Sequence, residues 1–247
     1  MSKKNRHKHG AHAYQNLFPR MKAEKSPIQL AQPSHESDSG KEVMVYQSEL
    51  DYISRCILDC PNIETGGQLF GFYASKGTPV ICYAIGAGLH ANHQITFFNQ
   101  DIDYLQTVGT ILNQEYGLQH IGEWHSHHRL GLDHPSGHDA QTMHHSIDAL
   151  HLGQFLLCIG TTDGRSATIN AYTFHENDPY YYPSKWHIKA EPSPYRQVID
   201  ERLKDLLVHP VTIEPRLSGM HISRISVAKY ADINYLLQAY NTNSIDL

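Results

Sequence analysis

The sequence contains no apolar run long enough to cross a membrane. Its 247 residues are 40% hydrophobic, yet no stretch approaches the roughly 18 consecutive apolar residues that a membrane-spanning helix needs. The first residues, Met-Ser-Lys-Lys-Asn-Arg-His-Lys-His, also lack the apolar segment of a secretory signal peptide. We therefore expect a soluble, cytoplasmic protein with no membrane partner.

Cysteine is scarce, and its spacing argues against a cysteine-based zinc site. The four cysteines, Cys56, Cys60, Cys82 and Cys158, form no Cys-x-x-Cys pair. Buried free thiols are the expected state in a reducing cytosol, so we assign these residues no ligand role. A zinc deaminase is excluded as well, because that class needs a Pro-Cys-x-x-Cys element.

Basic residues are concentrated at the N-terminus. Residues 1–26 hold seven of the 20 Lys and Arg residues and only one of the 25 acidic residues, which leaves 13 basic and 24 acidic residues in the rest of the chain. This asymmetry predicts a basic arm on an acidic body. Such an arm could contact nucleic acid, but a solvated tail is the simpler interpretation. His7, His9 and His12 within it could capture stray metal.

Composition divides the chain into three parts. Residues 26–41 are rich in Ser and Pro and lack periodicity, as is typical of a linker. We therefore predict a basic flexible arm and linker over residues 1–41, a folded domain over 42–175 and a C-terminal extension over 176–247.

Hydrophobic periodicity predicts the helices and strands of a mixed α/β domain. The expected helices span 48–60, 100–116, 136–150 and 194–207, and the expected strands span 67–73, 80–85, 94–98, 120–124, 154–160 and 167–174. Asn99 is the expected N-cap and Gly117 the expected C-cap of the helix over 100–116.

The segment that indicates chemistry is Glu-Trp-His-Ser-His-His-Arg-Leu-Gly-Leu-Asp-His-Pro-Ser-Gly-His-Asp, residues 123–139. Two residues apart at a strand end, His125 and His127 would project from the same face and reach one ion. Asp139 would supply a third ligand. Two imidazoles and one carboxylate suit zinc and leave a fourth position open, as in catalytic sites.

Each part of this pattern also has a simpler interpretation. The chain has 19 histidines, so a His-x-His pair can arise by chance. Ser136-x-x-Asp139 is also the pattern of a helix capping box. His128, His134 and His138 lie in or beside the spacer, and each could replace a ligand in a different register.

A second motif, Glu64-Thr65-Gly66-Gly67-Gln68, lies upstream, and Gly66 and Gly67 would let the backbone pass close to the site. With the histidine segment it resembles the JAMM metalloproteases, also called MPN+ or JAB, over roughly residues 45–175. The resemblance implies an α/β fold with a mixed, curved β-sheet flanked by helices, MPN/JAB-like and cytidine-deaminase-like. It also implies one zinc ion per chain on His125, His127 and Asp139. It makes Glu64 the acid/base residue and Ser136 the oxyanion donor.

Two positions depart from the family pattern. The spacer between His127 and Ser136 is one residue longer than usual, which a loop can absorb. His128 stands where a proline commonly follows the second histidine.

The family resemblance also implies an activity. It is that of an isopeptidase that removes or processes a ubiquitin-like modifier at its C-terminal tail. The histidine segment is most similar to bacterial members, the BilC type of deconjugase in antiphage defence, whose partners are the modifier, its conjugates and E1- and E2-like proteins. The alternative is a catalytically silent MPN scaffold or partner-binding subunit.

Overall fold

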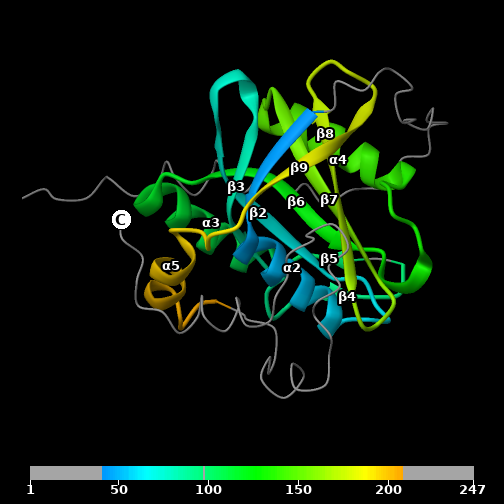
Figure 1. Cartoon of the computed structure of the whole chain (residues 1–247), viewed down its shortest axis with the longest axis horizontal. Helices are drawn as coiled ribbons and strands as arrows, with labels where there is room; N and C mark the ends of the chain where they lie inside the picture. Colours follow the sequence, from blue (N-terminus) through cyan, green and yellow to red (C-terminus); the bar gives the residue numbers. More distant parts are fainter. Residues whose placement is uncertain (1–40, 97, 208–247) are drawn as a thin grey trace, which may run out of the picture.

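The computed structural model describes residues 41–96 and 98–207 (Figure 1). Most of the basic arm and linker, and the extension beyond residue 207, lie outside these described residues. Within them, no helix combines the length and the apolar character that a membrane crossing requires.

Nine strands, four α-helices and two short 3-10 helices make up the described part of the chain. In chain order they are β1 (Lys41–Tyr46), α2 (Gln47–Asp59), β2 (Gly66–Tyr73), η1 (Ser75–Gly77), β3 (Pro79–Ile85), β4 (Asn92–His93), β5 (Phe98–Asn99), α3 (Ile102–Tyr116), β6 (Gln119–Ser126), η2 (His128–Leu130), α4 (Gly137–Leu150), β7 (Gln154–Thr162), β8 (Ala167–His175), β9 (Tyr181–Lys189) and α5 (Arg196–Arg202).

Seven strands form a mixed sheet that closes on itself in the order β1-β3-β2-β6-β7-β8-β9. β1 runs parallel to both β3 and β9, which closes the ring, and β6 runs parallel to β7. The other neighbouring pairs are antiparallel. The mixed α/β class is therefore confirmed, with a sheet that is closed as well as curved.

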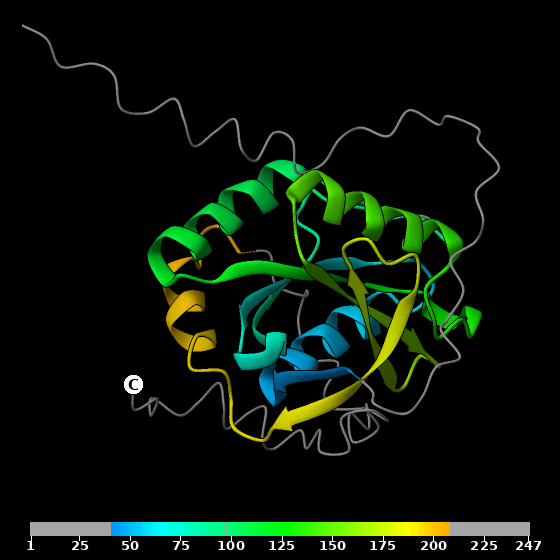
Figure 2. The ribbon, with the colours of Figure 1, turned by 90° about the horizontal axis from the view of Figure 1, so that it is seen from above.

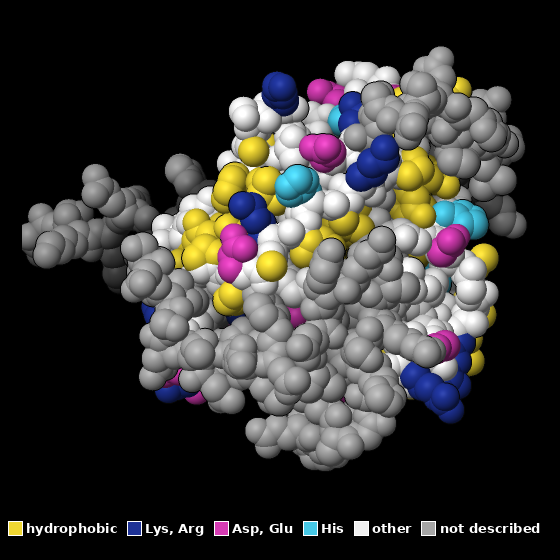
Figure 3. Space-filling model, in the orientation of Figure 1, with side chains coloured by type: hydrophobic (Ala, Val, Ile, Leu, Met, Phe, Trp, Pro, Cys, Tyr) yellow, Lys and Arg dark blue, Asp and Glu magenta, His cyan; other side chains and the backbone are white. Residues whose placement is uncertain are grey.

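Helices cover the sheet on both sides. Figure 2 shows α2 within the curve of the sheet and α3 and α4 outside it. α2 is buried all round because its apolar residues, such as Leu50 and Ile53, fill the interior of the sheet. α3 packs on β2 and β3 together with α5, and α4 packs on β7 and β8. On the face drawn in Figure 3, hydrophobic side chains of the described residues are interspersed with charged and histidine side chains.

The helices predicted over 48–60 and 136–150 are confirmed to within a residue at each end, but two local predictions are wrong. Asn99 is not the cap of α3. Asp101 is, because its carboxylate accepts from the backbone N–H of Tyr104 at 3.1 Å. The strand expected over 94–98 is instead a hairpin, in which His93 pairs with Phe98 across a loop.

The sheet continues beyond residue 175. Strand β9 pairs with β8 and with β1, although no strand is expected there from the sequence. The helix expected over 194–207 is shorter, since α5 spans Arg196–Arg202 and turns follow it.

His120 gives the fold a specific acid sensitivity. Its ring lies against Phe70 and Phe155, and its Nε2 has no hydrogen-bond partner. Burial lowers the pKa of His120 to about 4, below the value of about 6.5 for an unfolded chain. Its contribution to stability is therefore full above about pH 6.5 and is lost as the pH falls toward about 4.

Between pH 7.5 and pH 5, protonation of this residue should cost about 2 kcal/mol of unfolding free energy. Urea unfolding of the wild type and of His120→Phe at both pH values measures this difference. The wild type should lose more stability on acidification than the variant. Equal losses would contradict this assignment.

Candidate metal centre

The two histidines of the His-x-His pair are placed by strand β6. His125 pairs with Gly66 of β2 and with Ile159 of β7, so its backbone is fixed on both sides. His127 lies just past the strand, where its N–H still donates to the carbonyl of Gly160 at 2.7 Å. The two rings therefore lie on the same side, with centroids 5.0 Å apart.

A carbonyl in the following loop orients the ring of His127. Its Nδ1 lies 2.8 Å from the carbonyl oxygen of Leu132, which can only accept, so Nδ1 carries the hydrogen. In the neutral ring Nε2 then keeps its lone pair for a ligand. The loop itself is anchored, because the carbonyl of Asp133 accepts from the hydroxyl of Tyr172 and the amide of Asn170.

Asp139 comes from the first turn of α4. Ser136 is the N-cap, and the two residues form a complete capping box: the Ser136 N–H donates to the Asp139 carboxylate at 2.7 Å, and the Asp139 N–H donates to Ser136 Oγ at 3.2 Å. The capping interpretation of Ser136-x-x-Asp139 is thus confirmed. The capping box also holds the carboxylate at the helix start, facing the histidines.

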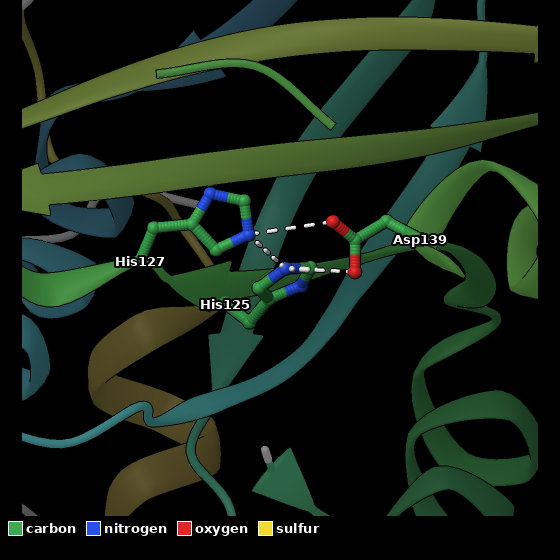
Figure 4. A group of neighbouring side chains, drawn as sticks. All are labelled: His125, His127 and Asp139. Carbon is green, nitrogen blue, oxygen red and sulfur yellow. Dashed lines mark hydrogen bonds and ion pairs between the residues drawn. The ribbon is translucent and has the colours of Figure 1, made fainter. Parts of the chain in front are cut away.

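The three side chains converge (Figure 4). The Nε2 atoms of His125 and His127 are 3.1 Å apart, and each lies 3.3 Å from one oxygen of Asp139. The three side chains are partly shielded from water, with exposures of 15%, 6% and 14% for His125, His127 and Asp139. Among the described residues, this is the group of ligand-type side chains that could hold a metal ion.

Interactions within the group shift the pKa values of Asp139 and His127. Burial alone would raise the pKa of Asp139, but hydrogen bonds with His125, His127 and Ser136 hold it well below its ordinary value. Burial lowers the pKa of His127, yet its contacts with Asp139 and the Leu132 carbonyl outweigh this and raise it. Asp139 is therefore an anion at neutral pH, as a metal ligand must be.

Glu64 lies beside this group, two residues before β2. The next residue, Thr65, pairs with Ser126, which separates the two histidines: Ser126 N–H donates to the Thr65 carbonyl at 2.7 Å, and Thr65 N–H donates to Ser126 Oγ at 3.1 Å. Burial raises the pKa of Glu64, and the nearby histidines partly oppose this. A raised pKa makes a carboxylate a better proton acceptor, which suits a residue that takes up a proton and returns it.

Gly66 and Gly67 permit the close approach that the sequence predicts. A Cβ on Gly66 would lie 3.0 Å from the Cβ of His125 and 2.6 Å from the ring of Phe98, and a Cβ on Gly67 would lie 1.8 Å from the carbonyl oxygen of Ile85. Larger residues would force the strand that follows Glu64 away from its neighbours.

The other histidines of the segment lie outside the group. His128 Nε2 donates to the carbonyl of Ile95 at 2.7 Å. His134 is exposed and contacts Asp133, and His138 is exposed on the first turn of α4. The register with His125, His127 and Asp139 is thus the one in which three ligand atoms meet.

Several residues around the site are not among those predicted from the sequence. Glu123 shares the His125 face of β6 by strand alternation, and burial, followed by the charge of Asp139, raises its pKa to about 7. That alternation was a usable signal. Nothing in the sequence indicated that the indole of Trp124 donates to the Ile85 carbonyl at 3.0 Å, or that Leu132 orients His127.

No protein-family model and no curated protein matches the sequence. Among solved structures, the solution structure of protein DSY2949 from Desulfitobacterium hafniense is similar, with a TM-score of 0.46 and 14% identity over 61% of this chain and 94% of that one. A likeness at this level defines neither a family nor a function.

Proposed function

We propose that the protein is a zinc-dependent JAMM-type isopeptidase. Its substrate is an amide or isopeptide bond that follows the C-terminal tail of a ubiquitin-like modifier, in a bacterial conjugation system. The observation that carries the proposal is the convergence of His125, His127 and Asp139 beside Glu64.

The donor set fits zinc. Three donors held about 2.0–2.1 Å from an ion at tetrahedral angles lie about 3.3 Å apart, and the separations here are 3.1, 3.3 and 3.3 Å. The orientation of His127 by Leu132 and the ionised state of Asp139 also suit a cation. When bound, zinc acidifies water and polarises a substrate carbonyl.

Glu64 moves the proton in this mechanism. Its carboxylate accepts a proton from the attacking water as the carbon–oxygen bond forms, and it delivers that proton to the amine nitrogen as the carbon–nitrogen bond breaks. The products are a carboxylic acid on the modifier and a free amine on the target. A pKa raised by burial suits both transfers.

Ser136 stabilises the developing oxyanion. Its Oγ accepts from the Asp139 N–H, and its own hydroxyl hydrogen can donate to the substrate oxygen. Losing one such donor costs about 3 to 4 kcal/mol of activation free energy.

We further propose that the closed sheet with α2 in its interior is an MPN-type arrangement.

The test uses the zinc-loaded protein and a ubiquitin-like protein fused at its C-terminus to a reporter. Intact mass spectrometry should show a cut directly after the modifier tail, absent from a sample containing a zinc chelator. If panels of modifiers remain uncut although one zinc is bound, the alternative of a silent scaffold is favoured.

A further inference from the structure

The β4–β5 hairpin holds both backbone polar groups of Glu64. The Glu64 N–H donates to the carbonyl of Gln94 at 2.8 Å. His93 Nδ1 donates to the Glu64 carbonyl at 2.9 Å, and because a carbonyl only accepts, Nδ1 must carry the hydrogen. The ring of His93 also contacts Phe98, which in turn lies over Gly66.

The residue after Gln94, Ile95, is held by a residue of the histidine segment. The Ile95 carbonyl accepts from His128 Nε2 at 2.7 Å. His128 directly follows the ligand His127, and only 5% of it is exposed.

His128 also has a strained backbone, with φ of +34°. A non-glycine residue in such a conformation is uncommon and persists only where its surroundings impose it. Its hydrogen bond to Ile95 is part of those surroundings.

Four residues thus form a continuous connection from Glu64 to the metal ligands, which we call the histidine bridge: His93, Gln94, Ile95 and His128. A second connection is the pair of bonds between Thr65 and Ser126. The bridge therefore fixes the main chain of Glu64 from the side that β6 does not reach. Position matters there, because a displacement of about 1 Å in a reacting group can cost about 10²-fold in rate.

We infer that His93 and His128 are positioning residues that hold Glu64 in place for proton transfer. The inference rests on the proposed function. It assigns these two histidines a role outside metal binding, since neither belongs to the ligand group.

Matched pairs of variants isolate the donated hydrogen bonds. His128→Gln places an amide N–H near the Nε2 position, and His128→Met is similar in size without the donor. His93→Asn places an N–H near Nδ1, and His93→Leu removes it. Both His128 variants share the backbone strain at that position, and both His93 variants remove the imidazole, so the difference within each pair reports the hydrogen bond.

Steady-state kinetics on the modifier fusion should show a fall in kcat of about tenfold or more for His128→Met and His93→Leu. KM and zinc content should stay close to wild type in all four. The donors in His128→Gln and His93→Asn should restore most of kcat. Equal kcat within both pairs would overturn the inference.

Amide hydrogen exchange of residues 92–95 gives a readout independent of activity. Exchange should be faster in His128→Met and His93→Leu than in their partners. Faster exchange with unchanged kcat would show that the bridge holds the hairpin without positioning Glu64, and so overturns the inference. A wild type that binds zinc and cuts no fusion overturns the proposed function, whereas the exchange data still decide whether the bridge exists.

Discussion

Replacing Glu64 by Gln should lower the rate of amide-bond cleavage by about 10²- to 10⁴-fold, the usual contribution of a general acid–base residue. The amide keeps the size of the side chain but cannot accept the proton at neutral pH. Zinc binding should be unchanged, because Glu64 is not among the three proposed ligand residues. His127→Ala, by contrast, should lose both zinc and cleavage.

Glu176→Gln is the matched control for Glu64→Gln. It makes the same chemical change at an exposed residue just past β8, at the opposite end of β7 from the site. Its activity should equal that of the wild type. Retained cleavage in Glu64→Gln, measured as kcat/KM with zinc content determined on the same sample, would overturn the proposed mechanism.

Replacing Arg196 by Met should destabilise the fold by about 3–5 kcal/mol, because it leaves a buried charge without its partner. Arg196 of α5 forms an ion pair with Glu49 of α2, and the Glu49 side chain is fully buried. Its guanidinium lies between the rings of Tyr52 and Tyr83, 4.4 and 4.1 Å from their centroids.

The same ion pair completes the hydrogen bonding of β3. Strand β1 pairs with β3 only at Val80 and Ile81, so Ala84 lies beyond it. The Ala84 N–H donates to Glu49 at 2.7 Å, and the Ala84 carbonyl accepts from Arg196 at 2.9 Å. The two side chains thus take the place of a neighbouring strand.

Denaturant unfolding of three proteins tests this role. The double variant Glu49→Gln/Arg196→Met removes the buried charge of Glu49 and keeps an acceptor for the Ala84 N–H, so it should be more stable than Arg196→Met alone. A single variant within about 1 kcal/mol of wild type, or a double variant no more stable than the single, would contradict the account.

Much of the candidate site could be predicted because its signals are local. His125 and His127 follow a predicted strand, and Ser136-x-x-Asp139 is a helix start in the sequence itself. Their supports could not be predicted, since the bonds of His127 to Leu132 and of His128 to Ile95 depend on how two loops fold. No pattern of residue types encodes a backbone carbonyl that turns toward a ring.

The fold likewise has parts that can be predicted from the sequence and parts that cannot. The long helices and the central strands carry clear periodicity, which predicts them closely. Strand β9 is not predicted, because Tyr181–Lys189 holds a proline and alternates exposed and half-buried residues. Its pairing with β1 also joins segments from the two ends of the described chain. Arg196 and Glu49 are likewise distant in sequence, and their contact became visible only in three dimensions.

Native mass spectrometry of the zinc-loaded chain shows whether His125, His127 and Asp139 form one metal centre, which the proposed function requires. The wild type, Asp139→Asn and a variant with His7, His9 and His12 all changed to Ala would be weighed side by side. We expect one zinc in the wild type and in the N-terminal variant, and none in Asp139→Asn. A wild type without zinc, or zinc lost only with the N-terminal histidines, would contradict the proposed function.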